Sequence, residues 1–185
     1  MDTTRHLDFD ELMAGVGGVL EAPADDGTVE AIVVRPRTNE RLQVEDCVVS
    51  PEGGVEGDTW AQGCWLELDD GSPHPDVQVT IMNCRVTNLI AQDRTRWALT
   101  GDQIFADLDV SHENLPIGQR ISIGSAVMEI TNQPHLGCKK FAHRFGNDAL
   151  RFVNRPEGRG LRLRGVYARI VEAGKIAVGD TIRKI

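Results

Sequence analysis

Short runs rich in apolar and β-branched residues recur along the chain from about Thr28, several of them alternating with polar residues, and this pattern is typical of β-strands. The runs 29–35 and 42–49 flank the turn-forming stretch PRTNE, so we expect a β-hairpin there. Further strands are predicted at 77–82, 104–110, 120–123 and 126–131, with a tight turn at Gly124-Ser125. A closing hairpin is predicted from 164–171 and 176–183, around the turn EAGK.

Helical spacing of apolar residues is limited to a few stretches. Residues 85–99 present one apolar face, with Asn83 as the N-cap and Gly101 as the stop signal. A second helix is predicted from Lys139 onward, and a further turn can begin at Asn147. A short helical turn is predicted at 8–13, and loops are predicted at 15–27 and 154–160.

Many short strands with two or three helices predict a mainly β fold, a closed or partly open β-barrel. The 185 residues can form one domain with a sizeable core, in which residues 1–27 are an N-terminal lead-in. No apolar run approaches the roughly 20 residues of a membrane span, and the acidic N-terminus carries no apolar targeting segment. The four cysteines form no CxxC pair, so we expect reduced thiols in a cytoplasmic protein that contacts no membrane.

Charge is distributed unevenly along the chain. Residues 1–137 carry 8 Lys and Arg against 24 Asp and Glu, whereas residues 138–169 carry 9 against 2. The basic stretch predicts a small anionic ligand such as a phosphate group, since Arg offers forked, charge-assisted donors; the alternative is a solvated basic face. Nucleic acid is not expected as a partner, because the rest of the chain would repel phosphates and aromatic residues are few.

The basic stretch begins at a lone cysteine, Cys138, which precedes Lys139 and Lys140. These cations, Arg144 and the N-terminus of the predicted helix would all favour the thiolate. A thiolate can attack an electrophile, carry sulfur or coordinate a soft metal. The alternative is a buried, inert structural thiol.

Several motifs occur in a specific order: GVEGD at 54–58, GDQIFADL at 101–108, LPIGQRISIGSAVMEIT at 115–131 and RGVYARIVEAGKIAVGD at 164–180, with Cys138 before the last. In this order, and with a helix near Asn88, they resemble the MOSC domain family. This family comprises the C-terminal domain of molybdenum cofactor sulfurases and stand-alone bacterial relatives. The likeness extends over nearly the whole chain from about Val29.

The resemblance implies a strand-rich, barrel-like fold and a cysteine tied to molybdenum cofactor (molybdopterin) chemistry. In the family this cysteine carries persulfide sulfur or sits at the molybdenum, and some members reduce N-hydroxylated substrates with electrons from a redox partner. Cys138 is therefore the expected catalytic residue and molybdenum ligand. We expect the cofactor to contact Lys139, Lys140, Arg144, Arg159, Arg164, Tyr167 and Arg169. A chain of this length holds no pyridoxal-phosphate enzyme, so a persulfide would come from a partner cysteine desulfurase.

The sequence departs from the family pattern in two places. Thr59-Trp60 stands where members commonly have a basic residue and His, and Asp107 replaces an amide. A carboxylate near an anionic cofactor is repulsive unless it is protonated or turned away. An alternative function is therefore a non-catalytic module that binds an anion or a protein and has lost the cofactor. A third interpretation takes His135, Cys138 and His143 as zinc ligands, although three ligands match no structural zinc pattern.

Overall fold

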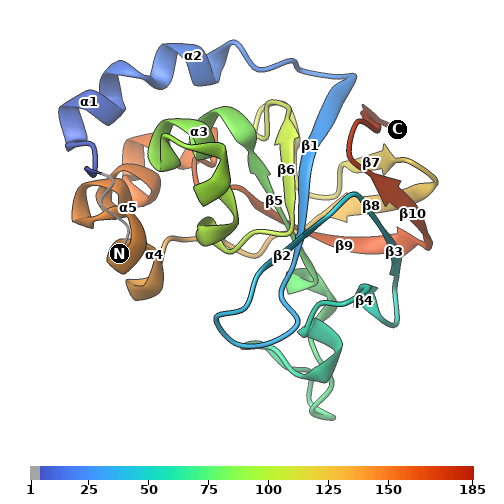
Figure 1. Cartoon of the computed structure of the whole chain (residues 1–185). Coiled ribbons are helices and arrows are strands. Elements are labelled where there is room, and N and C mark those ends of the chain that lie inside the picture. The colour runs from blue at the N-terminus through green and yellow to red at the C-terminus, as the bar shows by residue number, and fades with distance from the viewer. Residues whose placement is uncertain (1–4) are drawn as a thin grey trace.

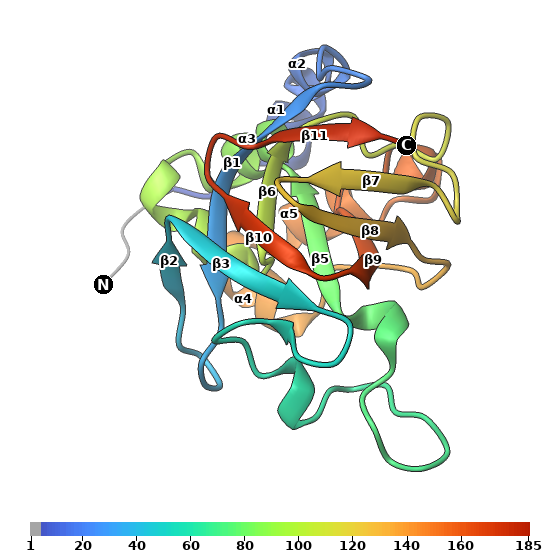
Figure 2. The same ribbon diagram turned by 90° about the vertical axis from the view of Figure 1, so that its right-hand side faces the viewer.

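The centre of the molecule is a closed β-barrel in the computed structural model, which describes residues 5–185. Seven strands of an eight-stranded sheet close on themselves, because the last of them pairs with both β7 and β1 (Figure 2). In barrel order the strands are β1 (Gly27–Val34), β6 (Ile104–Asp107), β5 (Val79–Asn83), β9 (Val166–Glu172), β8 (Ala126–Ile130), β7 (Arg120–Ile123) and β11 (Thr181–Lys184). The predicted mainly β, barrel fold is confirmed.

Two predicted hairpins differ from the observed pairing. β2 (Leu42–Val44) pairs with β1 as expected, but the run 42–49 breaks at Glu45 and its second half becomes β3 (Asp46–Ser50). β3 joins a small second sheet with β4 (Gly54–Val55) and β10 (Gly174–Ala177). The closing hairpin is therefore wrong: β10 pairs with β3, and β11 returns to the barrel. This pairing buries Cys47 and Val49 of β3 beside Ile176, which local alternation alone does not specify.

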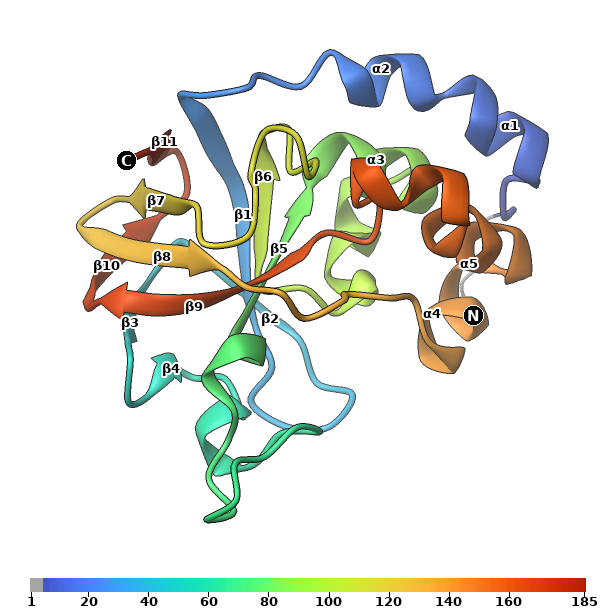
Figure 3. The ribbon, with the colours of Figure 1, turned by 180° about the vertical axis from the view of Figure 1, so that it is seen from behind.

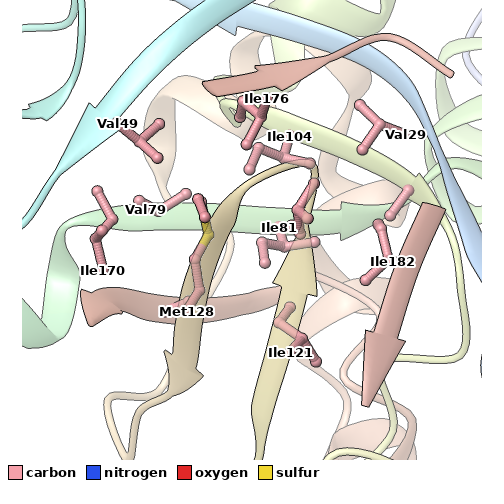
Figure 4. Packing of buried hydrophobic residues seen from close by; sticks show 14 of the residues in the cluster. Val29, Val49, Val79, Ile81, Ile104, Ile121, Met128, Ile170, Ile176 and Ile182 are labelled. Carbon is pink, nitrogen blue, oxygen red and sulfur yellow. The ribbon is translucent and has the colours of Figure 1, made fainter. Parts of the chain in front are cut away.

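Alternate residues of the central strands enter two separate cores. Val29, Ile81, Ile104 and Ile121 are fully buried inside the barrel, where they meet the side chains of neighbouring strands (Figure 4). Met82 and Phe105 point to the opposite face and pack under the helices. β5 is therefore buried over all five residues.

The helices gather on one side of the barrel, as Figures 1 and 3 show. The five α-helices are α1 (Phe9–Ala14), α2 (Val16–Leu20), α3 (Cys84–Ala91), α4 (Lys139–Phe145) and α5 (Asn147–Asn154). There are also four 3-10 helices: η3 (Arg94–Thr100) and η4 (Pro156–Leu161), which follow α3 and α5, and η1 (Trp60–Gln62) and η2 (Pro75–Val77), which lie between β4 and β5. Within residues 5–185, no helix is long and apolar enough to cross a membrane.

The helical predictions are only partly correct. Asn83 caps α3 as expected, its Oδ1 accepting from the amide of Arg85 at 2.8 Å. The predicted helix 85–99 nevertheless ends early, because Gln92 adopts φ 62° and Asp93 caps the separate helix η3. The expected loops at 15–27 and 154–160 contain helices α2 and η4, so the structure has more helices than the two or three predicted.

A parallel pair, β5 and β6, connects the barrel to the helical side. The crossover between these strands contains α3 and η3 and ends at residues 100–103. On the other edge of β5, β9 begins directly after Gly165, whose φ is +89°. The end of the crossover and the start of β9 thus flank the same buried strand.

Replacing Gly165 with Ala should destabilise the fold. The added Cβ would lie 2.4 Å from the carbonyl oxygen of Ile81, in a strand that cannot yield. Together with the positive φ, this clash should lower the free energy of unfolding by about 2–4 kcal/mol. Gly160→Ala is the matched control, because its Cβ would meet no atom within 4 Å. Urea unfolding measures both variants, and equal losses would contradict this packing.

Candidate functional site

A pocket with a volume of about 230 Å³ opens where β1 ends, beside β5, β9 and α4. We call it the cationic pocket, because Arg35, Arg37, Arg41 and Lys140 line it, and no Asp or Glu of residues 5–185 does. The first three belong to the loop between β1 and β2, and Lys140 lies in the first turn of α4. Segments more than 90 residues apart in sequence therefore contribute positive charge to one site.

Asp58, the last residue of the GVEGD motif, fixes one of these cations. Its buried carboxylate accepts from Arg35 at Nε (2.8 Å), Nη2 (2.9 Å) and the backbone amide (3.0 Å). It also accepts from the amide of Trp60 at 3.2 Å. The bidentate pair joins the end of β1 to η1 and neutralises the charge of Arg35.

Three consecutive carbonyl groups at the end of η3 hold three arginines from different elements. Leu99 accepts from Arg144 Nη1 at 2.7 Å, Thr100 from Arg164 Nη2 at 2.9 Å, and Gly101 from Arg35 Nη1 at 3.2 Å. These are the carbonyls that a helix C-terminus leaves without intrahelical partners. The end of η3 therefore anchors Arg35, which lines the cationic pocket, together with Arg144 and Arg164, which do not line it.

Arg41 and Arg144 provide positive charge that no carboxylate of the described chain neutralises by an ion pair. Both approach Gly101, where an added Cβ would lie 3.7 Å from Arg41 Nη2 and 4.0 Å from Arg144 Nη1. Burial, then the charges of Arg144 and Arg35, lower the pKa of Arg41, and its buried Nε has no hydrogen-bond partner. Such an arrangement favours an anion between these side chains.

Aromatic rings form another wall of the cationic pocket. Trp65 is 66% exposed, and its ring centroid lies 6.5 Å from that of Tyr167. The ring of Tyr167 packs in turn against that of His135, with centroids 4.5 Å apart and planes tilted by 47°. Burial raises the pKa of Tyr167, so at neutral pH the phenol keeps its proton and can donate a hydrogen bond.

Asp102 and Arg164 form a buried ion pair behind this wall. Arg164 Nη1 donates to both carboxylate oxygens of Asp102, at 2.6 and 2.7 Å, and both side chains are almost inaccessible. Burial alone would raise the pKa of Asp102, but the charge of Arg164 and its hydrogen bonds outweigh this effect and lower it. Arg164 is therefore committed to Asp102 and has no free fork for a phosphate.

The other expected cofactor contacts lie in different places. Arg169 faces the outside of the barrel, where it pairs with Glu129 and with Asp76. Arg159 is exposed at the end of η4 and borders another cavity. Lys139 is exposed at the start of α4. Of the expected contacts, Lys140 and Tyr167 line the cationic pocket, and Arg144 lies beside it, near Arg41 at Gly101. Lys139, Arg159, Arg164 and Arg169 lie outside this group.

Cys138 is the N-cap of α4 and is exposed, which excludes a buried, inert thiol. It lies two residues before Lys140, which lines the cationic pocket. The Asn154 side chain holds the preceding residue, Gly137, by accepting from its amide at 2.7 Å and donating to its carbonyl at 3.0 Å. By contrast, burial raises the pKa of the Cys47 thiol to about 11 and that of Cys84 to about 12.

The three predicted zinc ligands do not converge. His135 is directed inward against Tyr167 and Asp102, whereas Cys138 and His143 are exposed. Among the side chains that the structure describes, no group of three or more His, Cys, Asp or Glu is arranged to hold a metal. The zinc interpretation is therefore wrong.

The two departures from the family pattern have different structural consequences. Asp107 pairs with Arg85 at 2.7 Å and does not line the cationic pocket, so its charge is both neutralised and turned away. Thr59 and Trp60 do line the pocket, and the indole of Trp60 donates to the carbonyl of His74 at 3.2 Å. The 35–41 loop contributes three arginines to the lining of the same pocket.

Sequence reasoning missed several residues of the pocket: Arg35, Arg37, Arg41, Cys64 and Trp65. A usable signal was present, because three of the eight Lys and Arg residues in the acidic segment 1–137 fall within 35–41. Cys64 gave no such signal; its half-buried thiol donates to the carbonyl of Leu66 at 2.6 Å.

Comparisons with known proteins agree with this architecture. A family model described as the MOSC domain matches residues 78–183. YiiM from Escherichia coli aligns with a TM-score of 0.55 and 15% identity over 87% of this chain and 69% of its own. The YuaD protein from Bacillus subtilis aligns with a TM-score of 0.55 and 16% identity, over 84% of this chain and 93% of its own. The crystal structure of a hypothetical protein aligns with a TM-score of 0.57 and 16% identity, over 86% of this chain and 68% of its own. A search of curated proteins found no match.

Removing one partner of the buried pair should be costly. Asp102→Asn leaves the Arg164 cation buried without its counter-charge, and we expect a loss of about 3–5 kcal/mol in unfolding free energy. The double variant Asp102→Leu, Arg164→Met removes both charges and should recover most of this loss. The exposed Asp69 supplies the control Asp69→Asn, which should be neutral. Denaturant unfolding decides, and a neutral Asp102→Asn would refute the role of the pair.

His135 should make stability depend on pH. Burial, then the charge of Arg164, lower its pKa from 6.5 to about 3. As pH falls below 6.5, His135 binds a proton in the unfolded chain but stays neutral in the folded protein. The unfolded state is therefore favoured, and stability that is present above pH 6.5 is lost. Between pH 7 and pH 5 this linkage costs about 2 kcal/mol. His135→Phe should remove that part of the slope, whereas the exposed control His143→Gln should keep it; equal slopes in both variants would contradict the assignment.

Proposed function

The chain belongs to the MOSC domain family, and we propose that its cationic pocket holds the molybdenum cofactor while Cys138 acts beside it as molybdenum ligand or persulfide carrier. Two classes of activity follow from this role, sulfur transfer and the reduction of N-hydroxylated substrates. Sulfur transfer requires a partner cysteine desulfurase, and reduction requires a redox partner that supplies electrons.

The residues of the cationic pocket fit the anionic part of the cofactor. The observation that carries the proposal is the pair Arg41 and Arg144, whose guanidinium groups converge on Gly101 without a carboxylate partner. The unpaired, buried Nε of Arg41 is a donor that the protein itself does not satisfy. Lys140 adds a third charge from the first turn of α4. A phosphate oxygen would satisfy these donors and neutralise the like charges.

The aromatic wall fits the ring system of the same cofactor. Trp65 and Tyr167 offer a partly exposed aromatic surface, and the phenol of Tyr167 can donate a hydrogen bond. When bound, the cofactor supplies a molybdenum centre for redox or sulfur chemistry. The chain's own contribution is to orient it, to balance its charge and to present the exposed thiol of Cys138 at the start of α4.

The absence of a basic residue at Thr59-Trp60 favours the second candidate, a module that binds anions without catalysis. The position of Asp107 does not support this candidate, because Arg85 neutralises the carboxylate away from the cationic pocket. In a module of this kind Cys138 would be dispensable. Replacing Cys138 therefore separates the two functions.

Molybdenum content per chain tests the proposal in protein purified from a host that makes the cofactor. Wild type should carry molybdenum, and Cys138→Ser should lose it if the thiolate is a ligand. Arg41→Gln should weaken cofactor binding about tenfold, because a charge-assisted contact is lost. The matched control is Arg169→Gln, which removes an equal charge from the outside of the barrel and should leave the metal content unchanged.

A second measurement covers the carrier role. After incubation with cysteine and a cysteine desulfurase, intact mass spectrometry should show the addition of one sulfur atom to wild type and none to Cys138→Ser. Absence of both molybdenum and persulfide, with Cys138→Ser equal to wild type in anion binding, would reject the proposal and support the non-catalytic module.

A further inference from the structure

We propose that a second cavity, distinct from the cationic pocket, binds a small organic carboxylate with an apolar or aromatic body. The cavity has a volume of about 430 Å³, a size typical of small-molecule sites. It lies between the segment 131–136, the start of β9 and the 3-10 helix η4. This inference stands apart from the cofactor proposal, because no residue lines both cavities.

Two guanidinium groups at this cavity have no carboxylate partner among the side chains that the structure describes. Arg162 is half-buried, and it donates to the carbonyl oxygen of Leu115 at 2.5 Å and to His112 Nδ1 at 3.1 Å. The side chain of Arg159 is exposed and makes no hydrogen bond or ion pair with the described side chains and backbone. The third arginine of the lining, Arg164, is already neutralised by Asp102. The cavity therefore carries about two uncompensated positive charges, which an anion would balance.

The hydrogen bond of Arg162 also fixes the state of His112. A guanidinium can only donate, so Nδ1 of His112 must accept, and the ring proton lies on Nε2. Burial, then the charge of Arg162, lower the pKa of His112 and keep the ring neutral. His112 thus presents a donor and no negative charge to the cavity.

The remaining walls favour a ligand with an apolar body rather than inorganic phosphate. Ile117 and Leu136 are 50% and 52% exposed at the rim, and Val153 and Val166 are buried in the lining. Arg162 has already used Nη1 on a backbone carbonyl, so only part of its fork remains for a ligand. The free guanidinium of Arg159 and the apolar walls therefore suit a ligand that carries one negative charge on an apolar body.

The second cavity and the cationic pocket share one separating element. His135 borders the second cavity, and its ring stacks on Tyr167, which lines the cationic pocket. The same segment, 131–136, leads directly to Cys138. A ligand in the second cavity would therefore contact the segment that carries the reactive thiol.

The experiment compares two probes of equal shape, naphthalene-2-carboxylate and the neutral naphthalene-2-carboxamide. Each is titrated by NMR into the full chain from a host without cofactor synthesis, so the outcome does not depend on cofactor loading. The carboxylate should bind at least about tenfold more tightly than the amide. Backbone shifts should centre on Asn132, Leu161 and Gly165, which border the second cavity or adjoin it.

Variants give the second arm of the test. Arg159→Gln should weaken the carboxylate about tenfold and leave the amide unchanged. Because Arg159 is exposed, this variant should fold even if Arg162→Gln, which removes a buried hydrogen bond, does not. The matched control is Arg183→Gln, which should bind both probes as wild type does. Arg183 is an exposed arginine of β11 that pairs with Asp26. Equal affinity for both probes, no binding, or shifts confined to the 35–41 loop would overturn the proposal.

Discussion

The buried pair of Asp102 and Arg164 holds together the part of the molecule on which the candidate site is built. It links the end of the crossover that precedes β6 to the start of β9, across the buried strand β5. Two charges removed from water are stable only with close geometry and good hydrogen bonding, and Arg164 uses both terminal nitrogens for this, Nη1 on Asp102 and Nη2 on the Thr100 carbonyl. Because the positions of these groups are fixed, the end of η3 is rigid.

That rigidity extends to the cationic pocket. The carbonyls on either side of Thr100 hold Arg144 and Arg35, so residues from α4 and from the end of β1 are positioned by the same turn. Asp58 fixes Arg35 from the opposite side. Several arginines can lie close together only if their hydrogen bonds and ion pairs outweigh their mutual repulsion. An anionic ligand would reduce the positive potential that remains. The hydrogen bonds from the three carbonyls and the ion pairs with Asp58 and Asp102 thus offset the repulsion between the arginines.

Local pattern in the sequence predicts most of the strands but not their partners. The runs at 120–123 and 126–131 became adjacent strands because a tight turn at Gly124 determines the pairing. The run at 176–183 divides between two sheets, since Ile176 and Ile182 are buried beside different long-range neighbours. The charge excess after Cys138 indicated a basic site. Two of its arginines are instead neutralised by distant carboxylates, because Arg164 pairs with Asp102 and Arg169 pairs with Glu129. Side-chain partners this distant leave no local signal.

The segment 131–138 lies between the second cavity and the cationic pocket. Its backbone runs between the second cavity and the ring of Tyr167, and His135 is the side chain that fills the space between them. A charged imidazolium there would face the guanidinium of Arg164 in a dry environment, so the ring stays neutral and packs as an aromatic plate. Asn154 then holds Gly137 through two hydrogen bonds, and the exposed Cys138 follows directly. The thiol is thus exposed directly after a glycine whose amide and carbonyl are both hydrogen-bonded, which fixes the backbone that presents it.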